Sequence, residues 1–332
     1  MGRKAIITGV GHYAPPKVLT NQDLMQMVDT NDEWIFSRTG IRERRILEGD
    51  RGSSYMAHQA AEMALKNSHT DPKDIDLIIV ATVTPDTLFP STACRVQDML
   101  GADKAWGVDL NGACSGFLYA LSTGAQFIES GMHQKVLVIG ADKMSAIVDY
   151  TDRTTCILFG DAAGAVLLEP QESDDPHTGV IDAILRSDGE GARHLYMMGG
   201  GSLHPATHET VDNKMHYIYQ DGQTVFKFAV KGMADVSAEI LEKHQLTGKQ
   251  IKYFIPHQAN LRIIDAAARR MKLNDDQVVV NIERYGNTTA ATIPLALSEV
   301  YYDNKLEKGD YLVMAAFGAG FTWGSLLLRW AI

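Results

Sequence analysis

Three residues that could form a catalytic site lie in short turns marked by glycine or proline. Cys114 lies within a run of small residues, His257 directly follows a proline, and Asn287 directly follows a glycine. Cysteine supplies a nucleophile, and imidazole and carboxamide groups can stabilise an oxygen that gains negative charge. Taken singly, each also fits a structural role: a buried cysteine, a histidine bonded to backbone or an asparagine that caps a helix. Together they indicate nucleophilic attack on a carbonyl group.

The segment around Cys114 predicts how the sulfur is activated. The apolar run Trp106–Leu110 predicts a strand, and apolar residues at three- and four-residue steps from Phe117 to Ile128 predict a helix. Cys114 would lie at the start of that helix, where unpaired N–H groups and the helix dipole favour a thiolate at neutral pH. The neighbouring small residues would leave room for a carbonyl group and leave N–H groups free for an oxyanion. They are Gly112, Ala113, Ser115 and Gly116.

Apolar patterns predict alternating strands and helices along the rest of the chain. The predicted helices are Thr20–Val28, Ser53–Asn67, Thr92–Leu100, Phe226–Leu241, Leu261–Met271 and Gly286–Tyr302. The predicted strands are Ala5–Val10, Asp76–Thr82, Lys135–Gly140, Thr155–Glu169, Ile251–Ile255, Val278–Asn281 and Tyr311–Ala315. Thr30 or Asn31 would cap a further helix with Trp34 and Arg38 on one face, and Asn260 would cap Leu261–Met271.

The second half of the chain repeats the pattern of the first half. The strand before Thr84 matches the strand before His257. In addition, residues 136–140 followed by 160–168 match residues 311–315 followed by 318–327. This repeat predicts two similar α/β units, which we place at residues 1–172 and 173–332. Ligands of such sheets bind beyond the carboxyl ends of strands, so Cys114, His257 and the loop Phe317–Gly320 should meet at one edge.

The overall composition limits the class of protein. The chain has 332 residues and a net charge of −10, which argues against nucleic acid as the main partner. Cys94, Cys114 and Cys156 are widely spaced, which fits a reducing compartment and gives no zinc pattern. No signal peptide or membrane-length apolar run is present, so we expect a cytoplasmic protein without a membrane partner.

Residues 189–216 form the least regular stretch of the sequence. Four histidines lie there: His194, His204, His208 and His216. A metal site is the alternative, but Pro205 interrupts the helix that would align His204 with His208. We expect a mobile loop and no metal ion.

Cysteine, histidine and asparagine in this order also occur in papain-like proteases. That alternative is disfavoured, because the papain signature around the cysteine is missing and Cys114 lies deep in the chain. The two-copy α/β pattern also differs from a papain-like protease.

Seven strings in order make the chain resemble β-ketoacyl-[acyl-carrier-protein] synthase III, a condensing enzyme of the thiolase-like superfamily. The resemblance covers nearly the whole chain. The strings are 28–44 (VDTNDEWIFSRTGIRER), 111–117 (NGACSGF), 151–153 (TDR), 159–165 (FGDAAGA), 256–264 (PHQANLRII), 284–291 (RYGNTTAA) and 317–324 (FGAGFTWG).

The resemblance implies a fold, a reaction and catalytic roles. The fold would be two duplicated α/β halves in a five-layer αβαβα arrangement. Cys114 would take an acyl group from a short acyl-CoA, and malonyl-acyl-carrier-protein would then lose CO2 and attack the acyl-enzyme, which initiates fatty acid synthesis. His257 and Asn287 would donate hydrogen bonds to the malonyl thioester oxygen. Backbone N–H groups of Cys114 and Ala319 would form the oxyanion hole; relatives often carry glycine at the Ala319 position.

The resemblance also implies binding residues and partners. Trp34 and Arg153 would sandwich the CoA adenine, Arg38 would meet its phosphates, and Asn260 would contact pantetheine. Phe317 would pack at the acyl pocket, and Phe89 would reach the acyl pocket of a partner subunit in a homodimer. Acyl-CoA would be a substrate, with no separate cofactor. The acidic carrier protein would dock on a segment and a basic patch: Gln258, Ala259, Asn260, Leu261, Arg262, Arg269 and Arg270.

Related enzymes differ at identifiable positions. Thiolases carry a second cysteine in the C-terminal glycine loop, which Phe317–Gly320 lacks, and elongating synthases carry a second histidine where Asn287 stands. Chalcone synthase-like enzymes lack the Trp34–Arg38 string, and the glutamate base of hydroxymethylglutaryl-CoA synthase has no matching motif. An acyltransferase that performs no condensation on the same fold is the remaining alternative. Asn287 argues against it, because simple acyl transfer needs no enolate stabiliser.

Overall fold

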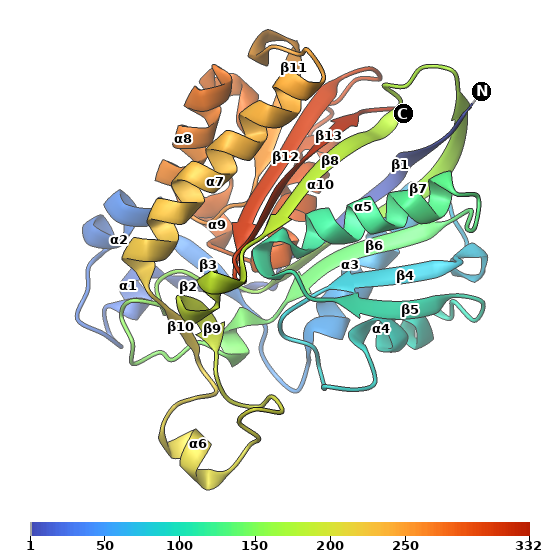
Figure 1. Cartoon of the computed structure of the whole chain (residues 1–332). Helices are drawn as coiled ribbons and strands as arrows, with labels where there is room; N and C mark the ends of the chain where they lie inside the picture. Colours follow the sequence, from blue (N-terminus) through green and yellow to red (C-terminus); the bar gives the residue numbers. More distant parts are fainter. Residues whose placement is uncertain (1) are drawn as a thin grey trace.

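In a computed structural model, which describes residues 2–332, two β-sheets stack face to face with helices between them and on both outer sides (Figure 1). The first sheet has the strand order β1 (Gly2–Tyr13), β7 (Ala162–Ser173), β6 (Val136–Asp142), β4 (Leu77–Ala81) and β5 (Trp106–Leu110). The second has the order β8 (Gly179–Ser187), β13 (Thr322–Arg329), β12 (Tyr311–Gly318) and β11 (Ile251–Pro256).

The two sheets repeat one topology. In the first, β1, β7 and β6 pair antiparallel and β6 pairs parallel with β4; in the second, β8, β13 and β12 pair antiparallel and β12 pairs parallel with β11. A parallel bridge between Phe254 and Val278 stands where β5 stands in the first sheet. The predicted α/β class and internal repeat are confirmed. The strands of the two sheets lie within residues 2–173 and 179–329, and the exact domain boundary at residue 172 stays a prediction.

Five layers follow from how the strands alternate. Along β6, Val136 and Val138 pack toward the helices between the sheets, whereas Leu137 and Ile139 pack toward the outer helices. Each such fully buried side chain contributes about 1.5–3 kcal/mol. The inner helices are α5 (Gly116–Glu129) and α10 (Thr292–Tyr302); the outer helices are α3 (Ser53–Asn67), α4 (Thr92–Leu100), α7 (Gly222–Lys243) and α8 (Leu261–Met271). The predicted five-layer arrangement is confirmed (Figure 1).

Smaller elements cover the edge where strands of both sheets end. Strands β2 (Lys17–Thr20) and β3 (Glu43–Ile46) pair antiparallel, with α1 (Asn21–Leu24) and α2 (Asp32–Thr39) between them in the chain. Asn31 caps α2, as expected. Strands β9 (Leu195–Met197) and β10 (Ile218–Gln220) also pair antiparallel, and α6 (His208–Asp212) lies in the segment that projects beyond them (Figure 1). The stretch predicted as a loop therefore contains a strand and a short helix.

Three sequence predictions of secondary structure are wrong for local reasons. The helix predicted from Gly286 begins only at Thr292, because Gly286 and Thr289 have left-handed backbones with φ of 62° and 49°. Residues 278–281 form one bridge instead of a strand, because the Val279 carbonyl bonds to the Gln258 side chain. The helix predicted for residues 20–28 is limited to α1, after which Met25 and Met27 face solvent.

A fourth prediction is wrong in its first part. Of residues 155–159, predicted as the start of a strand, 155–158 form turns and Phe159 forms a single parallel bridge with Asn287. The Asp152 carboxylate holds these turns by accepting hydrogen bonds from Thr154 N–H (2.9 Å) and the Thr155 hydroxyl (2.8 Å). Turns of this kind are typical of aspartate, whose side chain can bond to backbone two residues on.

Candidate active site

A cavity of about 940 Å³ lies at the edge where strands of both sheets end. Cys114 comes from the first half of the chain, and His257 and Asn287 come from the second half; all three line this cavity, together with Phe317 and Ala319. The structure thus brings the predicted nucleophile, donors and oxyanion loop together at a sheet edge, where α/β proteins bind ligands.

The turn that carries Cys114 is tied to the end of the second sheet. The Thr322 hydroxyl donates to Gly112 O (3.0 Å), and the Ser115 hydroxyl donates to Thr322 O (3.1 Å). A Cβ atom on Gly318 would lie 2.7 Å from Cys114 N, so only glycine allows β12 to approach this closely. The backbone that precedes Ala319 is therefore packed directly against the nucleophile turn.

Only part of the expected oxyanion hole is free within the turn Ala113–Ser115. Ser115 N–H donates to Gly112 O (3.0 Å), and Gly116 N–H donates to Ala113 O. The prediction that these two N–H groups are free is wrong, because the turn uses them to close itself. The N–H of Cys114 remains as the donor of this turn for an oxyanion.

The Cys114 sulfur is a buried thiol. Burial raises its pKa to about 12, and the charge of Asp142 acts in the same direction. The expected thiolate at neutral pH is therefore wrong for the folded protein, because removal of the sulfur from water outweighs the helix N-terminus. The thiol must lose its proton as it attacks a substrate carbonyl.

His257 lies directly after β11 and is 1% exposed. Its N–H donates to Ala315 O (2.8 Å), and its Nδ1 lies 2.8 Å from the Thr292 hydroxyl. Burial lowers the pKa of His257 to about 3, so the ring is neutral at physiological pH. Nε2 has no hydrogen-bond partner among the described residues, although it is buried. A buried polar nitrogen at a cavity calls for a ligand atom to pair with it.

Asn287 is held from both halves of the chain. Its N–H donates to Leu158 O (2.9 Å), and its carbonyl accepts from Gly160 N–H (3.0 Å). Its side-chain Oδ1 accepts from Thr289 N–H (2.9 Å). Because a backbone N–H can only donate, the oxygen of the carboxamide is fixed at this contact and the Nδ2 amino group is left as a donor.

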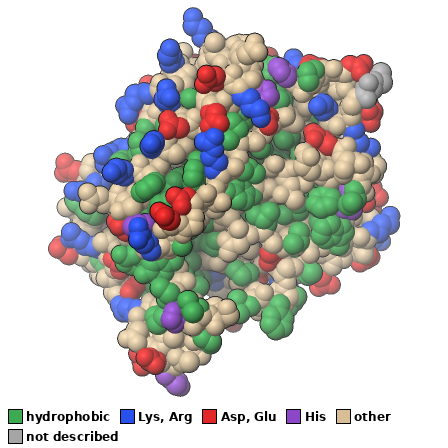
Figure 2. Space-filling view, in the orientation of Figure 1, with side chains coloured by type: hydrophobic (Ala, Val, Ile, Leu, Met, Phe, Trp, Pro, Cys, Tyr) green, Lys and Arg blue, Asp and Glu red, His purple; other side chains and the backbone are tan. Residues whose placement is uncertain are grey.

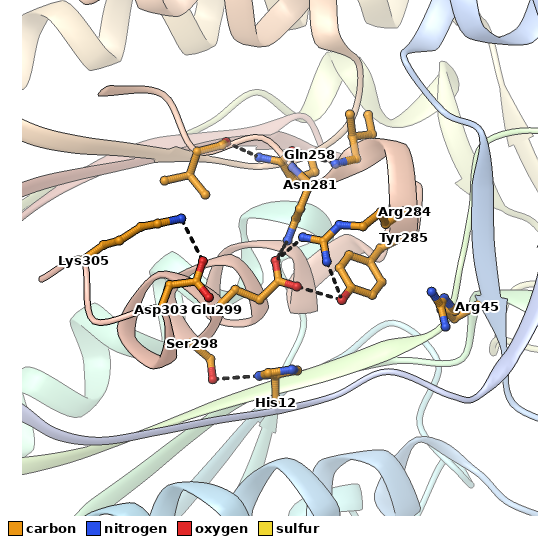
Figure 3. Close-up of polar contacts among 12 residues, drawn as sticks. His12, Arg45, Gln258, Asn281, Arg284, Tyr285, Ser298, Glu299, Asp303 and Lys305 are labelled. Carbon is orange, nitrogen blue, oxygen red and sulfur yellow. Dashed lines mark hydrogen bonds and ion pairs between the residues drawn. The ribbon is translucent and has the colours of Figure 1, made fainter. Parts of the chain in front are cut away.

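A polar network outside the cavity anchors the segment that leads to Asn287. Figure 3 shows residues of and next to α9 (Ile282–Tyr285) turned toward Glu299 of α10. The carboxylate of Glu299 accepts from Asn281 Nδ2 (2.8 Å), Arg284 Nη2 (3.0 Å) and the Tyr285 hydroxyl (2.7 Å). The network fixes the chain immediately before Gly286 and Asn287.

Gln258 also anchors this segment, and its position differs from the one predicted. It was predicted to contact the carrier protein, but it is 1% exposed. Its Nε2 donates to Pro256 O (2.9 Å) and Val279 O (3.0 Å), and its Oε1 accepts from Asn281 N–H (3.1 Å) and Ile282 N–H (3.2 Å). The side chain therefore joins the end of β11 to α9 (Figure 3) and is removed from the docking surface.

Asp142, which the sequence analysis missed, lies fully buried at the end of β6. Its Oδ1 accepts from the Thr82 hydroxyl (3.0 Å), Val83 N–H (2.8 Å), Thr84 N–H (3.2 Å) and the Thr84 hydroxyl (2.9 Å). Its Oδ2 accepts from the Thr289 hydroxyl and from Ala290 N–H (3.2 Å). Burial raises the pKa of Asp142, and these hydrogen bonds act in the opposite direction. Three donors are backbone N–H groups, so the geometry favours the carboxylate.

Of the predicted CoA residues, Arg38 and Asn260 line the cavity, whereas Trp34 and Arg153 lie outside its lining and are joined to it through the contact of Trp34 with Arg38. The guanidinium groups of Arg38 and Arg153 lie 4.8 Å and 5.4 Å from the centre of the Trp34 ring. An aromatic base between Trp34 and Arg153 needs about 3.5 Å of contact on each side, so the pair would have to separate to admit adenine. Arg153 also lies near Asp29, with 3.7 Å between Nη1 and Oδ2. Asn260 caps α8 as predicted, and its Nδ2 donates to Arg38 O (2.7 Å).

The basic residues of the predicted docking surface are exposed on α8. Arg262 stacks on Phe226 of α7 at 4.6 Å and lines the cavity mouth, whereas Arg269 and Arg270 lie at the far end of the helix. Arg270 forms a surface ion pair with Asp235 (3.6 Å). Figure 2 shows Lys and Arg side chains, with some carboxylates between them, on the side of the molecule where α7 and α8 lie. Ala259 and Leu261 are half-buried beside them.

The two phenylalanines predicted for the acyl pocket lie in different surroundings. Phe317 is buried, packs against Phe321 with ring centres 4.9 Å apart, and lines the cavity. Phe89 is 84% exposed and does not line the cavity of its own chain. The structure therefore joins only Phe317 to the cluster of predicted site residues.

Known proteins that match nearly the whole chain include several named as synthases III. The family described as 3-Oxoacyl-[acyl-carrier-protein (ACP)] synthase III matches residues 108–189, and its C-terminal counterpart matches residues 241–330. A β-ketoacyl-[acyl-carrier-protein] synthase III of Chlorobium chlorochromatii is 58% identical, covering 98% of this chain and 99% of the relative. The crystal structure of the 3-oxoacyl-[acyl-carrier-protein] synthase III of Aquifex aeolicus matches with a TM-score of 0.90 at 45% identity, covering 99% of this chain and 100% of that chain.

A further solved structure comes from a different pathway. The priming β-ketosynthase of the R1128 polyketide biosynthetic pathway matches with a TM-score of 0.91 at 35% identity, covering 99% of this chain and 97% of that chain.

Proposed function

This chain belongs to the β-ketoacyl-[acyl-carrier-protein] synthase III family, and we infer from its site that it condenses a short acyl-CoA with malonyl-acyl-carrier-protein. The enzyme is an acyltransferase of the condensing type, and its reaction initiates fatty acid synthesis. The observation that carries the proposal is the pairing of a buried thiol with two hydrogen-bonding groups at one cavity: neutral His257 with unpartnered Nε2, and Asn287 with a free amino group.

The first half-reaction forms an acyl-enzyme. The Cys114 sulfur attacks the thioester carbonyl of acyl-CoA, the bond from that carbonyl to the CoA sulfur breaks, and the thiol proton passes to the CoA sulfur. The tetrahedral oxyanion would be held by the N–H groups of Cys114 and Ala319, since the close approach of Gly318 brings the two loops together. Because the proton moves from one sulfur to another, the half-reaction needs no net base.

The second half-reaction forms the new carbon–carbon bond. The malonyl thioester of the carrier protein loses CO2, and the electron pair of the broken bond forms an enolate whose oxygen accepts from His257 Nε2–H and Asn287 Nδ2–H. The enolate carbon then attacks the Cys114 thioester, the bond from its carbonyl carbon to the Cys114 sulfur breaks, and the sulfur leaves as a thiolate that takes up one proton from water. A neutral ring has one N–H, so donation from Nε2 requires the Thr292 hydroxyl to donate to Nδ1. The scheme uses protein groups and two substrates, with acyl-CoA as a substrate and no separate cofactor.

The surroundings of the cavity support a route for each substrate. Trp34, Arg38 and Arg153 offer an aromatic face and two cations to a nucleotide, and Asn260 lies on the path inward. Arg262, Arg269 and Arg270 offer positive charge to an acidic carrier protein. We propose these as the CoA and carrier contacts, respectively.

We also propose a homodimer. Strand β5 is an edge strand of the first sheet, and Trp106 and Val108 on it are 44% and 39% exposed. Leu88 and Phe89 nearby in the chain are more than 80% exposed. An apolar sheet edge of this kind is suited to pairing with a second copy, which would let Phe89 reach the cavity of the partner. Molar mass in solution tests this, and a monomer at micromolar concentration would refute it.

Two observations bear on the proposed absence of a membrane partner and on the proposed cytoplasmic location. Among residues 2–332, no helix has the length and apolar character needed to cross a bilayer. All three cysteines are free thiols, which supports the proposed cytoplasmic location.

CO2 release tests the proposed function. The enzyme is incubated with acetyl-CoA and malonyl-acyl-carrier-protein labelled in the free carboxyl group, and released CO2 and β-ketoacyl-carrier-protein are measured. Equal amounts of both products are expected from the parent enzyme, with no β-ketoacyl-carrier-protein from the Cys114→Ala variant. Acyl transfer to the carrier protein without CO2 release would instead favour the non-condensing acyltransferase.

A further inference from the structure

Thr289 makes two hydrogen bonds that link the donor residue Asn287 to the first half of the chain. Its hydroxyl donates to Asp142 Oδ2, and its N–H donates to Asn287 Oδ1 (2.9 Å). Its carbonyl oxygen lies 3.1 Å from the Thr292 hydroxyl, but that hydroxyl has one proton, and the proposed donation from His257 Nε2 needs this proton at Nδ1, 2.8 Å away. Thr289 therefore holds Asn287 directly, and its role does not extend to His257.

The backbone of Thr289 is held in a conformation that threonine avoids. Its φ is 49°, in the left-handed region, which is a rare outlier for a β-branched residue. Such a conformation persists only where the surrounding structure enforces it. Here the enforcing contacts come from the first half of the chain, because Asp142 holds both the Thr289 hydroxyl and Ala290 N–H.

The first half of the chain approaches the same turn through its backbone. A Cβ atom on Gly140 would lie 2.3 Å from Ala290 O, so β6 packs against the turn at a distance that only glycine permits. Asp142 is fixed at its other oxygen by four hydrogen bonds from residues 82–84 after β4. The turn is thus clamped to two strands of the first sheet.

We infer that Thr289 is a positioning residue that sets the donor end of Asn287, and that Asp142 of the first half fixes it across the junction between the halves. This inference rests on the proposed function, because it gives the two donors their task in decarboxylation. Neither residue needs to touch the substrate for this role. Their effect is to fix the Asn287 carboxamide so that its Nδ2 amino group can donate into the cavity.

The test separates the two half-reactions in variants of Thr289. Thr289→Val keeps the shape and removes the hydroxyl, whereas Thr289→Ser keeps the hydroxyl. Acylation is followed by intact mass after mixing with acetyl-CoA, and decarboxylation by CO2 release from malonyl-acyl-carrier-protein. For Thr289→Val we expect kcat of CO2 release to fall by about 10- to 100-fold, with acylation and the KM for the carrier substrate within about twofold of the parent enzyme. Thr289→Ser should restore CO2 release to within about threefold.

Two controls make the outcome decisive. Ser237→Ala removes a buried hydroxyl that donates to Met233 O (2.7 Å) within α7, remote from the cavity, and should leave both half-reactions unchanged at a comparable cost in stability. If Thr289→Val does not fold, Thr289→Ala replaces it; alanine tolerates this backbone, since Ala113 has φ of 48°. Thr289→Ala and Thr289→Ser then differ only by the hydroxyl.

The inference fails if both half-reactions fall by the same factor, if CO2 release is unchanged in a folded variant without the hydroxyl, or if Thr289→Ser falls as far as Thr289→Val. Failure of the proposed function is distinguishable, because the parent enzyme would then release no CO2.

Discussion

The two halves of the molecule share a sheet topology and divide the chemistry unequally. In the first half, the turn after β5 carries Cys114, and the turn after β4 carries Thr82 and Thr84, which serve Asp142. In the second half, the turn after β11 carries His257, and the segment after the bridge at Val278 leads to Asn287. Matching turns thus hold a nucleophile and a structural clamp on one side, and two donors on the other. In the proposed mechanism, the nucleophile for acylation therefore comes from the first half, and both donors for decarboxylation come from the second half.

Removal of the nucleophile should give the largest loss of activity, and the step lost should be acylation of the enzyme. Cys114→Ala has no sulfur to acylate, so no mass increase is expected on incubation with acetyl-CoA, and condensation should be abolished. Cys94→Ala is the matched control, because Cys94 is an exposed free thiol that does not line the cavity. Acylation of the Cys114→Ala variant would contradict the assignment.

Loss of one donor should affect the other half-reaction. Asn287→Ala removes a hydrogen bond to the enolate oxygen, so we expect CO2 release to fall by about 10²- to 10³-fold. Acylation of Cys114 should change little, as judged by intact mass at short times. An equal fall in acylation would erase the proposed division between the halves.

The pH dependence should also differ between the halves. Because the pKa of the Cys114 thiol is raised to about 12, its thiolate fraction rises about tenfold per pH unit through neutral pH. Alkylation of Cys114 by iodoacetamide, measured by peptide mass, should therefore rise about 100-fold from about pH 7 to about pH 9. A plateau near neutral pH would show a thiolate instead.

His257 should give no such dependence near neutral pH. Its pKa is lowered to about 3, so the ring is already neutral well below pH 7. The rate of CO2 release from a preformed acyl-enzyme should stay within about twofold between about pH 5.5 and about pH 8. A sigmoidal rise near pH 6.5 would contradict the burial of a neutral ring.

A smaller effect is expected at the carrier surface of the second half. Arg262→Glu reverses a charge at the cavity mouth, so the KM for malonyl-acyl-carrier-protein should rise about tenfold while the KM for acyl-CoA rises much less. Lys252→Glu makes the same charge change at an exposed lysine that does not line the cavity, and it controls for net charge. If both variants behave alike, α8 is not the docking surface.

The smallest effect should lie at the CoA entrance of the first half. Trp34→Ala removes the aromatic face beside Arg38 and Arg153, and we expect the KM for acyl-CoA to rise about three- to tenfold. The KM for the carrier substrate should stay unchanged. A larger rise in the KM for the carrier substrate than in the KM for acyl-CoA would contradict the proposed contact between Trp34 and CoA.

The sequence predicted the elements with strong patterns and the residues with characteristic motifs. Helices α3, α4 and α8 and strand β5 have the predicted bounds, because their caps and apolar periodicity are local. The meeting of Cys114, His257 and Asn287 followed from strand ends and from the family resemblance. The sequence could not show that Gln258 turns inward, because its burial depends on backbone from residues 279–282.

Asp142 and Thr289 were missed for a related reason. Aspartate after a strand and threonine in a turn are common, and only the tertiary contact between them reveals their role. The protonation state of Cys114 was mispredicted because helix position is visible in the sequence, whereas burial of the sulfur is a property of the folded molecule.

The candidate active site lies between two units that each have a complete sheet. Enzymatic activity therefore depends on how the two units pack against each other. A slight slip of one unit against the other would leave nearly all secondary structure intact while moving the thiol away from its two donors. Enzymatic activity should then be lost at a lower urea concentration than the circular dichroism of the helices. Activity should therefore detect a change in the packing of the two units before the helical circular dichroism signal changes.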